Sequence, residues 1–314
     1  MHPFTKRRSQ SVSALGEEKL IRQIKRWLGA ASPRAPFGIG DDCALLPPSR
    51  GSQLITVDPV IYPHHFDDRV PPRQVGAKLL KRNLSDLAAM GGKPTAAVLA
   101  LTLGTDVSLS WLEQFYRGLA ACARRYRVPI VGGDIAQAES VLAASLTLLG
   151  EATSSRTLTR TGARRGDRIY VTGVLGGSLR TGHHYKFAPR LAEGAWLARR
   201  HEVLAMMDVS DGLAKDLHAI TPPGTAPAID SHALPLRFGA SVRAALSDGE
   251  DYELLFALSA AANARSFERQ WARAFPKVRL SCVGHFVTAG KLPAGSVELT
   301  AYRGYEHLKR HVVP

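Results

Sequence analysis

Short apolar runs typical of β-strands alternate with segments of helical periodicity along both halves of this 314-residue chain. Strand-like runs occupy residues 53–57, 95–103, 128–131, 141–149, 168–172 and 252–258. Helical spacing of apolar residues occurs at 15–28, 75–90, 110–122, 213–220 and 260–275, and glycine or proline separates many of these elements. We expect helices to begin at Ser110, with Glu113 completing a capping box, and at Ser259. This order of elements predicts an α/β or α+β fold.

The chain length is typical of two domains of ordinary size. A polar and basic stretch at residues 153–167 predicts their boundary near residue 152. We therefore expect an N-terminal domain at 15–152 and a C-terminal α/β domain at 153–314. Residues 1–14 are basic and lack an apolar segment, which indicates a disordered tail rather than a secretory signal.

The formal net charge of +14 raises the question of a nucleic-acid partner. The cations are spread along the chain, and no zinc-finger spacing, basic zipper or aromatic RNA-binding strand accompanies them. No apolar run approaches the roughly 18–20 residues that a membrane span needs. Three widely separated cysteines, Cys43, Cys122 and Cys282, are typical of reduced thiols in a cytoplasm. We expect a cytoplasmic protein without a membrane or nucleic-acid partner.

Acidic residues recur at turns, mostly beside glycine or serine and often after a strand-like run. They are Asp41 and Asp42, Asp58, Asp86, Asp134, Asp208 and Asp211, and Glu250 and Asp251. Carboxylates that gather at strand ends suit Mg²⁺, which prefers oxygen ligands and is commonly held together with substrate phosphates. Each acid taken alone is more often a turn or helix cap. The glycine-rich loops of the common nucleotide-binding folds are absent, so ATP would be bound by another fold.

The order and spacing of these stretches resemble the thiamine-monophosphate kinase family, a branch of a superfamily that includes aminoimidazole ribonucleotide (AIR) synthetase. The matching stretches are Gly38–Leu46, Lys81–Gly91, Val131–Asp134, Leu158–Ala163, Tyr170–Gly173, Asp208–Leu213, Gly249–Leu254 and Gly304–His307. The resemblance implies two AIR-synthetase-like domains, with the N-terminal mixed sheet pairing with a second copy to form a dimer barrel. It also implies Mg²⁺-dependent transfer of the γ-phosphoryl group of ATP to thiamine phosphate.

The resemblance also implies roles for individual residues. The metal set is Asp42, Thr56, Val57, Asp58, Asp86, Asp134, Asp208 and Asp211, of which Asp42, Asp86 and Asp134 are the catalytic candidates. The ATP contacts are Tyr116, Gly133, Asp134, Arg160 and Ser210. The substrate contacts are His65, Glu250 and Tyr305. Glu250 would offset the positive charge of the thiazolium ring, and Tyr305 would face that ring.

Some positions depart from the family pattern. Val57 replaces a hydroxyl residue, Pro63 stands where glycine is common, and Gly177 where aspartate is common. Ile135, Ala136 and Gln137 replace two hydroxyl residues and an arginine. These changes leave open an ATP-dependent enzyme with another small acceptor, or a non-enzymatic derivative of the family.

Overall fold

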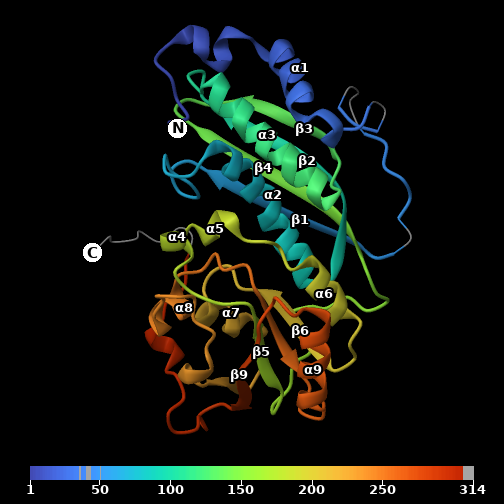
Figure 1. Cartoon of the computed structure of the whole chain (residues 1–314), viewed down its shortest axis with the longest axis vertical. Coiled ribbons are helices and arrows are strands. Elements are labelled where there is room, and N and C mark those ends of the chain that lie inside the picture. Colours follow the sequence, from blue (N-terminus) through green and yellow to red (C-terminus); the bar gives the residue numbers. More distant parts are fainter. Residues whose placement is uncertain (35–36, 40–43, 50, 307–314) are drawn as a thin grey trace. The chain divides into compact units, whose positions relative to one another are not determined.

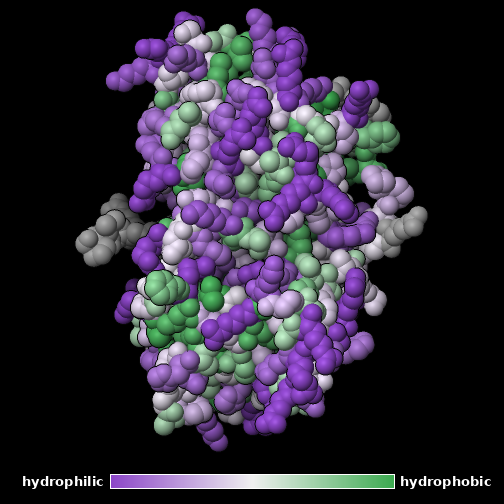
Figure 2. All heavy atoms as spheres, in the orientation of Figure 1, coloured by the Kyte–Doolittle hydropathy of each residue, from purple (hydrophilic) through white to green (hydrophobic). Residues whose placement is uncertain are grey.

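The computed structural model describes residues 1–34, 37–39, 44–49 and 51–306. The chain forms two compact units, one from Met1–Leu87 and Gly92–Ala152 and the other from Ala88–Gly91 and Thr153–Pro314 (Figure 1). Both contain a β-sheet and helices, which confirms the predicted mixed α/β class. Within the described ranges, no helix combines the length and apolar character that a membrane crossing requires. Hydrophilic side chains cover much of the face seen in Figure 2, with apolar patches between them.

The first unit is built on a four-stranded mixed sheet in the order β1-β4-β2-β3, in which β2 and β3 are parallel and the other pairs antiparallel. Its strands are β1 Gln53–Ile61, β2 Gly92–Leu103, β3 Ile130–Gln137 and β4 Leu142–Ala152. Its helices are α1 Glu17–Leu28, α2 Pro72–Ala89 and α3 Leu109–Tyr126, with the 3₁₀ turns η1 Arg8–Gln10, η2 Val12–Ala14 and η3 Gly29–Ala31.

The two faces of this sheet differ in character. Leu99, Leu101 and Leu103 alternate along β2 and are buried on the face that α2 and α3 cover (Figure 1). The two helices approach so closely at Gly118 of α3 that a Cβ there would strike the backbone of α2. On the opposite face Ile55 and Val57 of β1 are 72% and 60% exposed. One face therefore carries the core of the unit, while the other presents apolar side chains to the surroundings.

The residues expected as a disordered tail have defined contacts in the structure. The amide of Ser108 donates to Pro3 O at 2.7 Å, and the amide of Thr5 donates to Asp106 O at 2.8 Å. The ring of Phe4 meets the edge of Tyr62, with 5.7 Å between ring centroids. The structure therefore differs from the sequence expectation because the N-terminal segment carries Phe4 and pairs its backbone with the turn before α3.

The second unit contains a five-stranded antiparallel sheet in the order β6-β8-β5-β9-β7. Its strands are β5 Arg168–Thr172, β6 Val203–Asp208, β7 Thr225–Ile229, β8 Leu254–Leu258 and β9 Leu280–Thr288. Its helices are α4 Ser178–Thr181, α5 His183–Lys186, α6 Leu191–Ala198, α7 Leu213–Ile220, α8 Val242–Ser247 and α9 Ala264–Ala274, with the turns η4 Ser231–Ala233 and η5 Leu299–Ala301.

Helices cover both faces of this second sheet. Ile169 and Leu255 pack with Leu217 of α7, while Tyr170 and Phe256 pack with the helices on the other side. Every residue of β8 is buried as a result. This three-layer arrangement leaves the loops at the ends of the strands as the places where polar side chains can gather.

Two helix starts differ from their predicted positions. The side chain that caps α3 is Ser108, which accepts from the amide of Trp111, rather than Ser110. Asn263 caps α9 by accepting from the amide of Ser266, so Ser259 is not the cap. Both corrections have the same cause, since the capping residue is the one whose side chain reaches the free amides of the first turn.

Candidate functional site

Two side chains of β1 face two side chains of α2 on the covered side of the first sheet. Thr56 and Asp58 are two residues apart and leave the strand on one face. Arg82 and Asp86 are one helical turn apart on α2. The Thr56 hydroxyl donates to Asp86 Oδ2 at 2.6 Å, and Arg82 Nη2 lies 3.1 Å from Asp58 Oδ1. Three predicted metal ligands, Thr56, Asp58 and Asp86, thus lie together with the guanidinium group of Arg82.

No role was predicted for Arg82 from the sequence. Its side chain is only 14% exposed, and Nη1 also donates to Pro59 O at 2.6 Å. The signal was available, because Arg82 lies within the matched Lys81–Gly91 stretch and precedes Asp86 by one turn. What the sequence did not contain was the pairing of this turn with Asp58.

A second cation of α2, Lys78, contacts the predicted substrate contact His65. The backbone of His65 is fixed by the buried Lys78, whose Nζ donates to the His65 carbonyl at 2.8 Å. The ring Nδ1 of His65 accepts a hydrogen bond from the amide of Ile61, at the end of β1, at 3.2 Å. Burial lowers the pKa of Lys81 to about 8. The covered face therefore combines acids with the positive charge that a cluster of acids requires.

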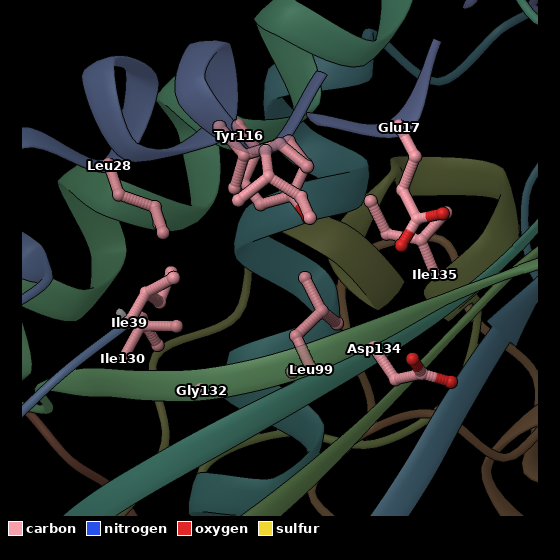
Figure 3. A pocket seen from close by; sticks show the side chains of 12 residues that line it. Glu17, Leu28, Ile39, Leu99, Tyr116, Ile130, Gly132, Asp134 and Ile135 are labelled. Atoms are coloured by element: carbon pink, nitrogen blue, oxygen red, sulfur yellow. The ribbon is translucent and has the colours of Figure 1, made fainter. Parts of the chain in front are cut away.

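Val57 and Asp134 belong to the opposite face of the same sheet. Asp134 of β3 is in register with Ala100, whereas Asp58 is in register with Leu146, whose partner on β2 is Leu99. Figure 3 shows the side chains of Leu99 and Asp134 leaving the sheet in opposite directions. The structure therefore does not bring Asp134 onto the face that holds Asp58.

A cavity of about 110 Å³ lies between α1, α3 and the parallel pair β2–β3 of the first unit (Figure 3). Most of its lining is apolar, from Ile21, Ile24, Leu28, Ile39, Leu99, Ile130 and Ile135. Three predicted ATP contacts, Tyr116, Gly133 and Asp134, line it together with Gly132 and Glu17. The cavity thus joins an apolar slot to a glycine-rich strand.

Two of these lining residues are fixed by packing. A Cβ at Gly133 would strike the carbonyl oxygen of Leu99 on the neighbouring strand, so the position suits only glycine. Tyr116 is buried on α3, and this burial raises the pKa of its hydroxyl. Its ring packs against Trp27 of α1 at a centroid distance of 5.9 Å. The cavity walls are therefore rigid on the sides of both residues.

In the second unit the predicted acids surround the turn that follows β6. Asp208 ends this strand in register with Leu254. The carboxylate of Asp216 on α7 accepts from the amides of Ser210 and Asp211 at 3.0 and 3.1 Å. Burial raises the pKa of Asp216 to about 7, and the charge of Asp211 adds to this rise. Asp216, which the sequence analysis did not single out, fixes the shape of the turn.

The predicted substrate contacts Glu250 and Tyr305 meet this same turn. The amide of Glu250 donates to Ser210 O at 2.7 Å, and the amide of Tyr305 donates to Asp211 O at 2.8 Å. Lys215 Nζ donates both to Asp211 Oδ2 and to Tyr305 O at 2.6 Å. The structure thus brings a predicted metal ligand, an ATP contact and two substrate contacts together within this unit.

Buried ion pairs hold the loop that carries Glu250. Arg190 contacts both carboxylate oxygens of Glu253, and Arg237 Nη2 lies 2.9 Å from Asp251 Oδ1. Burial raises the pKa of Asp251 to about 6, although Arg237 favours the charged form. Asp251 was counted among the acids at turns, whereas no role was predicted for Arg190, Arg237 and Glu253. Asp251 and Glu253 both lie inside a matched stretch. These two ion pairs position the loop that carries Glu250.

Arg160 lies on an exposed part of the second unit. Its neighbour Thr159 accepts through its carbonyl from the amide of Met206 at 2.8 Å, which holds the segment beside β6. The chain is therefore held at Thr159, directly before the exposed Arg160.

The donor chemistry of the first unit suits Mg²⁺. Thr56, Asp58 and Asp86 offer only oxygen atoms, as this cation prefers. Asp42, the remaining catalytic candidate, lies outside the described residues. Over the ranges that the structure describes, no three His, Cys, Asp or Glu side chains are grouped closely enough to hold a metal ion.

Comparisons with known proteins identify the family to which this chain is similar. Residues 40–152 match the family described as AIR synthase related protein, N-terminal domain. The chain is 32% identical to a thiamine-monophosphate kinase of Synechococcus elongatus, over 96% of this chain and 99% of that protein. It is 36% identical to the corresponding protein of Salmonella typhimurium, over 77% and 82% of the two chains.

Solved structures give the same result. The thiamine-monophosphate kinase of Stenotrophomonas maltophilia K279a is similar with a TM-score of 0.72 and 30% identity, over 88% of this chain and 96% of that chain. The structure of AaThiL complexed with AMPPCP and TMP gives a TM-score of 0.68 and 29% identity, over 97% and 99%. The resemblance expected from the motifs is confirmed, and the chain belongs to the thiamine-monophosphate kinase family.

Proposed function

We propose that this protein transfers the γ-phosphoryl group of ATP to thiamine phosphate and thereby forms thiamine diphosphate. The observation that carries the proposal is the match, over nearly the full length of both chains, to thiamine-monophosphate kinases. A similar structure is complexed with AMPPCP, an analogue of ATP, and with TMP. Donor and acceptor in the proposed reaction correspond to these two ligands.

The apolar cavity of the first unit is the proposed site for the nucleotide base. Its aliphatic lining and the ring of Tyr116 suit a flat heterocycle, and Gly133 allows a ligand to approach the backbone of β3. Ser210 and Arg160 are the proposed phosphate contacts of the second unit, since the planar guanidinium group can bind two phosphate oxygens at once.

The proposed metal ligands in the first unit are Asp42, Thr56, Val57, Asp58, Asp86 and Asp134, where Val57 contributes its carbonyl. Those of the second unit are Asp208 and Asp211. Because Asp134 lies on the opposite face of the sheet from Asp58, the two acids would hold different ions. Thr56 holds Asp86 through the 2.6 Å hydrogen bond and so fixes the direction in which its second oxygen points. Bound Mg²⁺ would neutralise the charge of the phosphate groups.

The acceptor supplies its own nucleophile. A phosphate monoester is anionic at neutral pH, so no side chain has to remove a proton before attack. The residues of the protein therefore act by binding two anionic groups and holding them in line. His65, Glu250 and Tyr305 are the proposed contacts of thiamine phosphate, with the carboxylate of Glu250 offsetting the cationic thiazolium ring.

The exposed face of the first sheet is the proposed homodimer interface. Val57 of β1 is in register with Thr147, which pairs with Val98 of β2, and Ile55 is in register with Leu149. Contiguous apolar side chains on an open sheet face favour burial against a second protein surface. The same face of a second copy would bury them.

Cys122 and Cys282 are free thiols in the described part of the chain, which supports the proposed cytoplasmic location.

The test is to measure ADP release by the purified protein with Mg²⁺ and ATP, with and without thiamine phosphate, while chromatography follows thiamine diphosphate. We expect product in the wild type and none in Asp86→Asn. Mg²⁺-dependent ATP binding without product would indicate another acceptor, as the changes at Val57, Pro63, Ile135–Gln137 and Gly177 allow. Absence of ATP binding would refute the proposal.

A further inference from the structure

We propose that Arg82 supplies a permanent positive charge at Asp58 that takes the place of a divalent cation. The protein would then bind one divalent ion fewer than its carboxylates could otherwise hold. This inference rests on the proposed function, because it concerns the ions that accompany ATP, and it revises the proposed metal set by removing Asp58 from it. It makes Arg82 a positioning residue that determines how many metal ions the site uses.

The guanidinium group of Arg82 is held at two points. Nη2 lies 3.1 Å from Asp58 Oδ1, and Nη1 donates to Pro59 O at 2.6 Å. The side chains of Arg82 and Asp58 are 14% and 24% exposed, so solvent screens their attraction only partly. Two directed contacts from one planar group fix its orientation, whereas a lysine would offer a single mobile charge.

The guanidinium group occupies the side of Asp58 where a divalent ion would otherwise bind. Asp58 of β1 and Asp86 of α2 lie on the same covered face, where Arg82 contacts Asp58 and the Thr56 hydroxyl donates to Asp86 Oδ2. A divalent ion bound to Asp58 would lie beside the guanidinium group and be repelled by it. Arginine does not lose its proton in proteins, so the repulsion persists at every working pH.

A purely structural ion pair makes a different prediction from a charge that replaces a metal ion. If Arg82 only stabilises the fold, its loss changes stability and leaves the number of bound ions unchanged. If it replaces a cation, its loss frees Asp58 to bind one. The number of ions per chain therefore separates the two roles without any measurement of catalysis.

The experiment counts Mn²⁺ bound to the full-length protein in the presence of AMPPCP, by electron paramagnetic resonance of free Mn²⁺. We expect Arg82→Met to bind one more Mn²⁺ per chain than the wild type, and Arg82→Lys, which keeps the charge, to bind the wild-type number. Asp58→Asn added to Arg82→Met should remove the extra ion. Arg82→Gln keeps a donor for Pro59 O and provides a second neutral variant if Arg82→Met does not fold.

Arg73→Met is the matched control, because Arg73 is an exposed arginine of the same helix whose Nε donates to the side chain of Gln114 at 2.6 Å. It should bind the wild-type number of ions. The inference is overturned if neutral variants at position 82 bind the wild-type number, or if the extra ion persists without Asp58. Failure of every variant and the wild type to bind AMPPCP with Mn²⁺ would instead refute the proposed function, and the inference with it.

Discussion

Arg190 donates two hydrogen bonds to the buried carboxylate of Glu253, from Nε to Oε2 at 2.7 Å and from Nη2 to Oε1 at 2.5 Å. The hydroxyl of Thr172 donates to the same Oε2 at 2.7 Å. A Cβ at Gly173, which directly follows β5, would strike this carboxylate, so the position suits glycine. The loop that presents Glu250 is therefore anchored to the centre of the second sheet by a charge that is almost fully enclosed.

Arg190→Met should lower the free energy of unfolding by about 3–5 kcal/mol, because it leaves the carboxylate of Glu253 buried without its main cation. Denaturant unfolding measures this change. Arg165→Met removes an exposed arginine of the same unit and should change the free energy of unfolding by less than about 0.5 kcal/mol. Equal effects of the two substitutions would show that the buried pair does not stabilise the loop.

Thr56→Val should raise the Mg²⁺ concentration needed for half-maximal activity. The substitution keeps the shape of the side chain but removes the donor to Asp86. A hydrogen bond to a charged group contributes about 1.5–3 kcal/mol, which corresponds to roughly tenfold or more. Thr56→Ser restores the hydroxyl and should return the Mg²⁺ requirement towards the wild-type value. An unchanged requirement in Thr56→Val would place Asp86 outside the metal site.

Asp216 should make the stability of the protein depend on pH. Its pKa is raised from 3.8 to about 7 in the folded protein by burial. Between these values the folded chain keeps a proton that the unfolded chain loses, so the free energy of unfolding falls as pH rises towards 7 and levels above it. At about 1.36 kcal/mol per pKa unit, the full effect is up to about 4 kcal/mol.

Asp216→Asn keeps an oxygen acceptor for the amides of Ser210 and Asp211 but cannot titrate. Urea unfolding of the variant between pH 5 and 8 should therefore give a flatter stability profile than the wild type. The two profiles are compared by their difference, which cancels the titration of other groups such as Asp251. Parallel profiles would mean that the Asp216 carboxyl group has an ordinary pKa in the folded protein.

Val57→Glu should convert the proposed dimer into a monomer. Val57 is 60% exposed on the open sheet face, and a carboxylate buried there against a second copy would lack a partner. Light scattering after size-exclusion chromatography measures the mass. Phe238→Glu is the control, since Phe238 is 99% exposed on the second unit and should leave the mass unchanged. A monomeric wild type would exclude this interface.

The order of elements was predictable because most strands and helices carry their own periodicity. β5 and α7 begin and end where the sequence pattern predicts. β7 was missed because it is short and contains Pro227, which is tolerated only because this strand lies at the edge of its sheet. The missing information was the partner strand, which no local pattern contains.

For the candidate site, too, the individual residues were predictable but their spatial partners were not. Motifs identified the acids, but their grouping depends on the register between strands. Asp134 and Asp58 belong to matched stretches and lie on opposite faces, because their positions are offset by one residue across the sheet. Arg82 and Asp216 were missed because each acts through a partner distant in sequence or through backbone amides, and neither contact leaves a signature in residue order.

Deletion of residues 1–14 should expose the turn before α3. In the full chain the amide of Ser108 donates to Pro3 O and the amide of Val12 donates to Val107 O. Hydrogen exchange at the Ser108 amide should therefore accelerate on deletion, because its acceptor is lost. The amide of Leu112 donates to Ser108 O inside the first turn of α3 and provides the internal control. Equally fast exchange at Ser108 in both proteins would support the disordered tail that the composition predicts, since a segment without stable contacts protects no amide.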